Sequence, residues 1–216
     1  MRLVSGKTVR MHGKILLLPL MFLFPLMNAG AELSLGAFIA PARAVTWVEG
    51  LDSGSHEGFA SSIDGRWIFL RPAGSDQPSV PAHDGKTPKA GIILFTGFSL
   101  QYIDMQASSW LSDGSRYRAW NALALAPYIG VGVAFRGFWP EAGQRLALSA
   151  GPSASFSNYS GTSLYSAYWS GWLRPEWELG IGRHLHFSLE LPIEYCARAD
   201  GTSVLAGIGL GVRYVF

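Results

Sequence analysis

Three side chains that could support hydrolysis stand at alternate positions, His186, Ser188 and Glu190. A histidine can act as the base that activates a serine nucleophile, and a carboxylate can orient that histidine. In an extended segment all three would point to one side, but neighbouring members would be about 7 Å apart along the backbone. A direct hydrogen bond between serine and histidine is therefore not assured. A catalytic triplet and a purely structural set are the two interpretations.

The other charges of the carboxyl-terminal half favour the structural interpretation. Charged side chains that are removed from water need partners, and guanidinium forks match carboxylates. We therefore predict an interior network of ion pairs, without a catalytic site or a cofactor. A metal site is not predicted, because His184 and His186 supply two ligands and no third. The network is expected to contain Arg136, Arg145, Arg174, Arg198 and Arg213 with Glu176, Glu178, Glu190 and Glu194.

The last thirteen residues, 204–216, indicate which kind of element carries these charges. Apolar and aromatic residues occupy every second position back from Phe216, including Tyr214. The positions between them hold glycines, two aliphatic residues and Arg213. Side chains on a strand alternate between two faces, so this strand has an apolar face and a small or charged face. Ending on an aromatic residue is typical of a strand that closes a transmembrane barrel at the lipid–water boundary.

The amino-terminal end predicts export. Residues 1–14 carry Arg2, Lys7, Arg10 and Lys14 and no acid, and an apolar run follows over 15–27. That run is shorter than the roughly 20 residues that a spanning helix needs. Small residues, Ala29 and Ala31, then precede Glu32, as at a signal-peptide cleavage site. We expect residues 1–31 to be a signal peptide cleaved after Ala31. A retained anchor helix is the alternative, and translation could start at Met1 or at Met11.

Composition supports a membrane barrel after this cleavage. Removing the four leader cations from the 17 Lys and Arg leaves 13, against 15 Asp and Glu, so the net charge becomes −2. The basic character of the whole chain is therefore not evidence for nucleic-acid binding. Charged residues make up 15% of the chain, below the usual level of about 25%. Cys196 is the only cysteine, so no internal disulfide is expected.

Alternation predicts an all-β fold over 32–216, a transmembrane antiparallel up-and-down β-barrel of 8 strands. Seven stretches carry the pattern, and both chain ends of such a barrel normally lie on the same side, which requires an even number. The missing strand is expected over 62–71, with 50–61 and 72–89 as connections. The seven clear strands fall at 33–47, 91–104, 123–135, 146–156, 169–181, 185–196 and 204–216.

Connections and aromatic residues fit the same topology. Tight turns are expected at 136–144 and 182–184, and serine- and glycine-rich outward loops at 106–119, 157–164 and 199–203. Aromatic side chains that sit at strand ends are typical of the belts at membrane interfaces. One predicted rim contains Trp47, Tyr102, Tyr165, Trp169 and Tyr195, and the other Phe138, Trp139, Phe187, Tyr214 and Phe216.

The leader, the strand rhythm and the closing Tyr214-Val215-Phe216 resemble small outer-membrane barrels of the OmpA, OmpX and OmpW type. The resemblance implies localisation in a Gram-negative-type outer membrane, with outer-membrane lipids, the secretion apparatus and the barrel-insertion machinery as partners. It also implies that Tyr214 and Phe216 act as the carboxyl-terminal insertion signal. The chain departs from OmpA in lacking a peptidoglycan-binding domain, and from OmpW in its charged interior.

Three functions are compatible with such a barrel. The first is a non-enzymatic envelope or surface protein with a filled interior, which binds an extracellular ligand through its loops. The second is a narrow OmpW-like channel for small, hydrophobic solutes. The third is a lipid A-modifying enzyme, because some lipid A deacylases resemble this chain in a His-x-Ser pair on a barrel strand. A triplet that faces the interior near a turn on the periplasmic side argues against the third.

Overall fold

The computed structural model describes residues 32–48, 53–70, 90–107, 119–136, 143–159, 165–182, 184–198 and 201–216. These residues form antiparallel strands. Among them there is no helix that is long and apolar enough to cross a membrane. The strands are β1 (Glu32–Val48), β2 (Gly54–Leu70), β3 (Gly91–Ala107), β4 (Trp120–Arg136), β5 (Gly143–Tyr159), β6 (Tyr165–Ile181), β7 (Leu185–Glu190), β8 (Ile193–Arg198), β9 (Gly201–Gly207) and β10 (Gly209–Val215).

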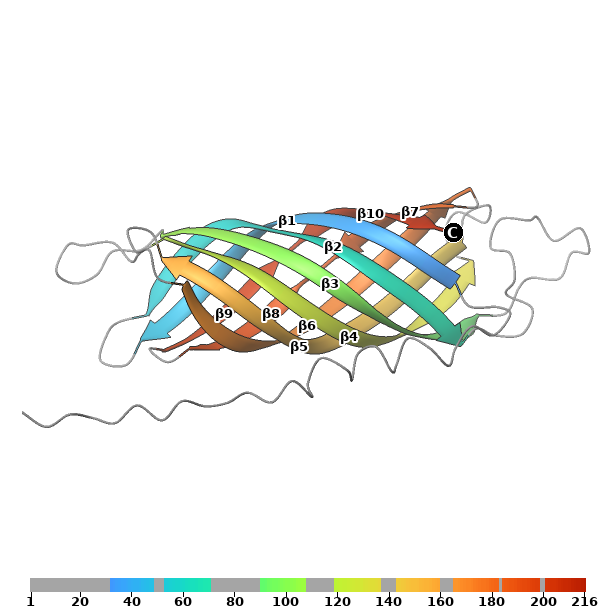
Figure 1. Cartoon of the computed structure of the whole chain (residues 1–216). Helices are drawn as coiled ribbons and strands as arrows, with labels where there is room; N and C mark the ends of the chain where they lie inside the picture. The colour runs from blue at the N-terminus through green and yellow to red at the C-terminus, as the bar shows by residue number, and fades with distance from the viewer. Residues whose placement is uncertain are drawn as a thin grey trace, which may run out of the picture.

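The ten segments make a closed ring of eight wall strands (Figure 1). Segments β7 and β8 both pair with β6 and form one wall strand that is interrupted at Leu191 and Pro192. Segments β9 and β10 form the last one, interrupted at Ile208. The ring closes where β1 pairs with β9 and β10, with Ser34 opposite Val215. The predicted antiparallel, eight-stranded barrel is confirmed.

Both the start of β1 and the end of β10 lie at one end of the barrel, which we call the terminal rim (Figure 1). At this rim, the Val215 amide donates to the His184 carbonyl and the Phe216 amide donates to the Leu33 carbonyl. The turn between β6 and β7 contains Gly182, whose φ of 72° is a conformation that favours glycine. The other end of the barrel is called the opposite rim.

The predicted second strand was too short. Strand β2 has 17 residues and starts at Gly54, so most of the predicted 50–61 loop is strand. Its serines and glycines have low strand propensity, but they are hydrogen-bonded between β1 and β3 on both sides. The predicted loops at 106–119, 157–164 and 199–203 and the turn at 136–144 are likewise shortened by residues that belong to strands. The residues predicted to connect β2 to β3, 72–89, lie outside the described residues.

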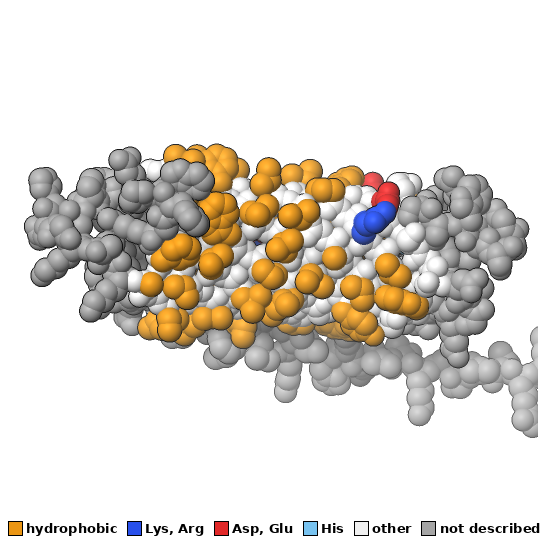
Figure 2. Space-filling model, turned by 180° about the vertical axis from the view of Figure 1, so that it is seen from behind, with side chains coloured by type: hydrophobic (Ala, Val, Ile, Leu, Met, Phe, Trp, Pro, Cys, Tyr) orange, Lys and Arg blue, Asp and Glu red, His pale blue; other side chains and the backbone are white. Residues whose placement is uncertain are grey.

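Side chains alternate between the two faces of the wall along most of each strand. Most large apolar side chains of the described strands point outward, and Ile129 and Leu210 are 72% and 67% exposed. Figure 2 shows apolar side chains distributed over the wall, with charged side chains only near one end. A soluble domain would bury such residues, whereas a barrel surrounded by lipid exposes them. The predicted outward faces of all seven recognised strands are observed.

The interior has two layers. Towards the opposite rim it contains an apolar layer of alanines from β1, β2 and β4 packed against large side chains, including Trp120, Tyr168 and Met105. Buried polar side chains such as Thr46 and His56 also lie in this half. Towards the terminal rim it contains buried charges next to a second apolar cluster that includes Phe95, Tyr128 and Trp172. The fold therefore positions the charges in one half of the lumen.

Candidate functional site in the barrel interior

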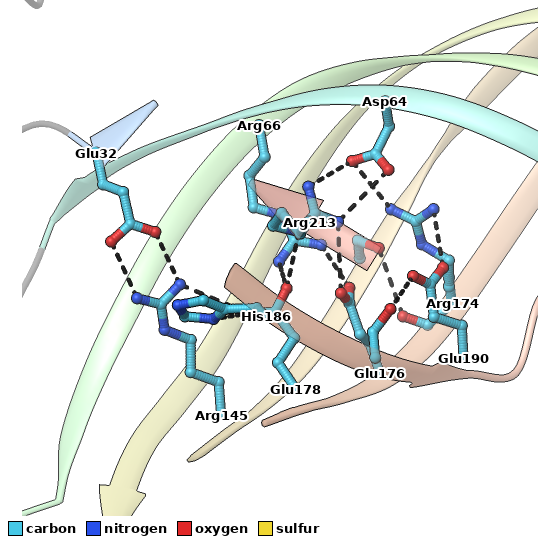
Figure 3. Close-up of polar contacts among 12 residues, drawn as sticks. Glu32, Asp64, Arg66, Arg145, Arg174, Glu176, Glu178, His186, Glu190 and Arg213 are labelled. Carbon is cyan, nitrogen blue, oxygen red and sulfur yellow. Dashed lines mark hydrogen bonds and ion pairs between the residues drawn. The ribbon is translucent and has the colours of Figure 1, made fainter. Parts of the chain in front are cut away.

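The buried charges come from β1, β2, β5, β6, β7 and β10 and meet in the lumen (Figure 3). On β1, β2, β5 and β6 they lie in the half of the strand nearer the terminal rim. Each of them is at most 6% exposed. The set, which we call the charged cluster, comprises Glu32, Asp64, Arg66, Arg145, Arg174, Glu176, Glu178, His186, Glu190 and Arg213.

Arg213 on β10 pairs with three carboxylates of the charged cluster. Its Nη1 donates to Asp64 Oδ2 at 2.9 Å, and its Nε donates to Glu178 Oε1 at 2.9 Å. Its Nη2 lies 3.4 Å from Glu176 Oε1. One guanidinium therefore links carboxylates of β2 and β6, and the planar fork of arginine suits this role.

Other arginines cross the lumen. Arg66 on β2 donates from Nη1 to Glu178 Oε1 at 2.6 Å and also pairs with Glu176. Strands β2 and β6 are four positions apart in a ring of eight, so this contact spans the barrel. Arg145 on β5 binds Glu32 on β1 through two hydrogen bonds of 2.8 and 2.9 Å, again between opposite wall strands. These cross-lumen ion pairs obstruct the terminal half of the lumen.

Aromatic side chains complete the surroundings of two arginines. The guanidinium of Arg66 lies 4.4 Å from the centre of the Phe95 ring. The guanidinium of Arg174 lies 5.2 Å from the Trp172 ring and 5.5 Å from the Tyr128 ring. Ring faces attract cations, and this attraction increases when water is excluded. The second apolar cluster thus stabilises the charges beside it.

The structure brings together most of the residues predicted for the interior network. Arg145, Arg174, Glu176, Glu178, Glu190 and Arg213 all lie in the charged cluster. Glu194 is also buried, but it lies beyond Pro192 on β8 and accepts a hydrogen bond from Ser170. The side chains of Arg136 and Arg198 lie outside the described part of the structure.

Sequence reasoning missed Glu32, Asp64 and Arg66. Asp64 and Arg66 lie on β2, the strand with the weakest alternation, so their orientation was not assigned. Glu32 directly follows the predicted cleavage site and was not considered as part of the interior. The signal that could have found Asp64 and Arg66 is their two-residue spacing, which places them on the same face as buried Ile68.

The His186, Ser188 and Glu190 triplet does face the lumen. Ser188 Oγ donates to Glu190 Oε1 at 2.7 Å, while His186 Nδ1 lies 3.7 Å from Glu178 Oε2. The Ser188 hydroxyl is thus directed at a carboxylate. His186 and Ser188 are buried, with exposed fractions of 2% and 4%. A nucleophile needs its base within hydrogen-bonding reach. In this structure the Ser188 hydroxyl bonds Glu190, and His186 faces Glu178.

No cluster of three or more potential metal ligands occurs within the described residues. Tyr214 and Phe216 are exposed on the outer wall at the terminal rim, where His184 stacks on Tyr214 with ring centres 5.6 Å apart. Trp47, Tyr102, Trp169 and Tyr195 are exposed near the opposite rim, and Phe187 near the terminal rim. Ala29, Ala31, Phe138 and Trp139, and the side chain of Tyr165, lie outside the described residues.

Comparison with known proteins adds a fold-level similarity. No protein-family model and no curated protein matches the chain. Among solved structures, Neisserial surface protein A aligns with a TM-score of 0.54 and 13% identity, covering 87% of this chain and 100% of the other. The outer membrane protein OprG from Pseudomonas aeruginosa aligns with a TM-score of 0.37 and 9% identity, covering 88% and 97%. The attachment invasion locus protein Ail of Yersinia pestis aligns with a TM-score of 0.36 and 14% identity, covering 83% and 97%. With its ring of eight antiparallel strands, this chain has the fold of Neisserial surface protein A.

Proposed function

We propose that this protein is an integral outer-membrane barrel whose filled lumen does not conduct and whose role is non-enzymatic, at the cell envelope or cell surface. The observation that carries the proposal is the set of cross-lumen ion pairs, because Arg66, Arg145 and Arg213 each reach carboxylates on other sides of the ring. Barrels of about eight strands have room only for side chains or one small ligand. A polar interior enclosed by an apolar outer wall is what a bilayer requires.

Filled interior layers support the closed state. The apolar layer packs Trp120, Met105 and Tyr168 against the small side chains of β1 and β2. Between this layer and the charged cluster, a cavity of about 30 Å³ is found. A cavity of this size has room for about two water molecules. It is too small for the hydrophobic solutes of the alternative channel function.

Planar-bilayer recording tests the closed lumen. Protein purified in detergent from outer membranes is added to a bilayer, and a water-filled porin serves as the positive control. We expect no stable single-channel steps from the wild type. The variant Arg43→Ala, whose side chain is 80% exposed and pairs only with Glu57 on the outer wall, should behave identically. Uniform, repeatable steps from the wild type would favour the channel function.

Membrane integration and surface function need separate measurements. We expect the folded protein to require detergent, to migrate on gels in a heat-modifiable way and to display protease-accessible loops in whole cells. A mature protein that stays monomeric in detergent-free buffer would contradict the proposal. The insertion role of Tyr214 and Phe216 belongs to the same proposal. It predicts that Phe216→Ala lowers assembly in cells while the purified variant still refolds in detergent.

The absence of enzymatic activity is also part of the proposal. It is supported by the direction of the Ser188 hydroxyl, which donates to Glu190. Lipid A from cells that express the wild type, Ser188→Ala or no protein should have the same acylation pattern by mass spectrometry. A missing acyl chain that depends on Ser188 would establish the enzymatic alternative.

A further inference from the structure

The cavity in the middle of the barrel lies where the two interior layers meet. Its wall includes Arg174 from the charged cluster and Ile103 and Leu205 from the apolar layer. Ser62, Gln101, Trp172 and Glu194 add polar atoms. Pro192, at the interruption between β7 and β8, also borders it. The cavity therefore combines polar groups with a volume of about 30 Å³.

Three side chains on this wall carry polar atoms that form no hydrogen bond with another described residue. They are Ser62 Oγ, Trp172 Nε1, and Nε and Nη2 of Arg174. The exposed fractions of these residues are 8%, 6% and 3%, so bulk water does not compensate for the missing bonds. Arg174 uses its Nη1 for Glu190 at 3.2 Å, and its Nη2 lies 3.8 Å from Asp64. These contacts leave most of its donors unused.

The unpartnered groups have one chemistry in common. The indole and guanidinium nitrogens only donate hydrogen bonds, and the serine hydroxyl can also donate. Buried donors are rarely left without an acceptor in native proteins. We propose that this cavity is a binding site for one compact hydrogen-bond acceptor, a water molecule or a chloride ion, held by Ser62, Trp172 and Arg174. This proposal does not depend on the surface role.

Electrostatics favours water over chloride. Glu194 shares the cavity wall, and Asp64 and Glu190 lie next to Arg174. These carboxylates would repel a chloride ion. A water molecule can instead accept a hydrogen bond from Trp172 and donate one to a carboxylate. Both ligands would use the same donors, so experiment must distinguish them.

A pair of serine variants tests whether the cavity is occupied. Ser62 and Ser99 are both buried, both hydroxyls lack a protein partner, and only Ser62 borders the cavity. Removing a hydroxyl that bonds nothing is neutral or stabilising, whereas removing one that binds a ligand is destabilising. We expect Ser62→Ala to lower the urea midpoint of the protein in detergent relative to Ser99→Ala. Equal midpoints, or a higher one for Ser62→Ala, would overturn the proposal.

A crystal structure of the full barrel grown with bromide separates the two ligands and does not depend on any variant. We expect one density peak within hydrogen-bonding distance of Trp172 Nε1 and Arg174. A peak without bromide anomalous signal identifies water, and a peak with that signal identifies a halide. A cavity that is filled by a moved side chain, or that contains no density, would overturn the proposal.

Discussion

At the residue scale, Arg213 is the arginine that links three carboxylates of the charged cluster. It bonds carboxylates of β2 and β6 while itself lying on β10. Replacing a whole buried ion pair with apolar residues often leaves the free energy of unfolding unchanged or raises it. Removing only one partner lowers it strongly, because the other charge stays buried without compensation. The effect of removing Arg213 therefore depends on the carboxylates that would stay buried without it.

The variant Arg213→Ala should destabilise the barrel by about 3–5 kcal/mol, because Asp64 and Glu178 would lose a buried partner. Urea unfolding in detergent micelles, followed by tryptophan fluorescence, measures this loss. The matched control is Arg43→Ala, whose exposed ion pair with Glu57 contributes at most about 1 kcal/mol. Equal effects of the two variants would contradict the buried network.

The pair formed by Glu32 and Arg145 offers a charge-swap test. Glu32→Arg places two cations together, and Arg145→Glu places two carboxylates together, so each single variant should be strongly destabilised. The double variant restores opposite charges, and its loss should be smaller than the sum of the two single losses. Additive losses in urea unfolding would show that the two side chains do not interact.

Much of this residue-level detail could be predicted from alternation alone. The inward orientation of Arg174, Glu176 and Glu178 follows from the apolar residues between them. The identity of their partners could not be predicted, because Arg66 and Asp64 come from a strand more than a hundred residues away in the chain. Pairing across a lumen depends on ring order and strand stagger, and a local pattern contains neither.

At the scale of elements, the strands are longer than a bilayer requires. The first six have 17 residues each, against about 10 for a membrane-spanning strand. Outward polar residues appear towards the opposite rim, as at Arg43 on β1 and Asn121 on β4. Local pattern located the apolar middle of each strand but not its polar ends, where hydrogen bonding to neighbouring strands overrides propensity.

Strand β4 provides a depth test of the lipid contact. Ile129→Lys puts a charge in the middle of the apolar belt and should cost about 2–4 kcal/mol in lipid vesicles. Asn121→Lys, on the same outward face near the opposite rim, should cost about 0–1 kcal/mol because it lies near the interface. Urea unfolding from vesicles measures both. The same small cost at both positions would mean that Ile129 does not face hydrocarbon.

A glycine on β3 makes room for a tyrosine of β4. A Cβ added to Gly97 would collide with the carbonyl oxygen of Gly65 and with the ring and hydroxyl of Tyr128, which donates to Asp64 at 2.8 Å. We expect Gly97→Ala to displace that ring and destabilise the barrel by about 1–3 kcal/mol. The control, Gly65→Ala, adds a methyl group with no atom within 4 Å and should be nearly neutral. Thermal unfolding in detergent compares them, and equal midpoints would contradict this packing.

At the scale of the whole molecule, the parity argument succeeded because topology constrains what local pattern cannot detect. Seven recognisable strands required an eighth, and the ring closes only because β2 is present between β1 and β3. The two-layer interior could not be predicted, because it depends on which residues of different strands lie at the same level along the barrel axis. A small cavity lies between the charged layer and the apolar layer among the described residues.

The distribution of the cross-lumen ion pairs has a consequence for biogenesis. Four guanidinium groups and five carboxylates are sheltered only after strands from both ends of the chain have met. A half-assembled sheet in the bilayer would hold these charges against hydrocarbon, at a cost that no partial structure can offset. Assembly should therefore be all-or-none. The pairing of β1 with β10 that closes the barrel should coincide with the burial of these charges.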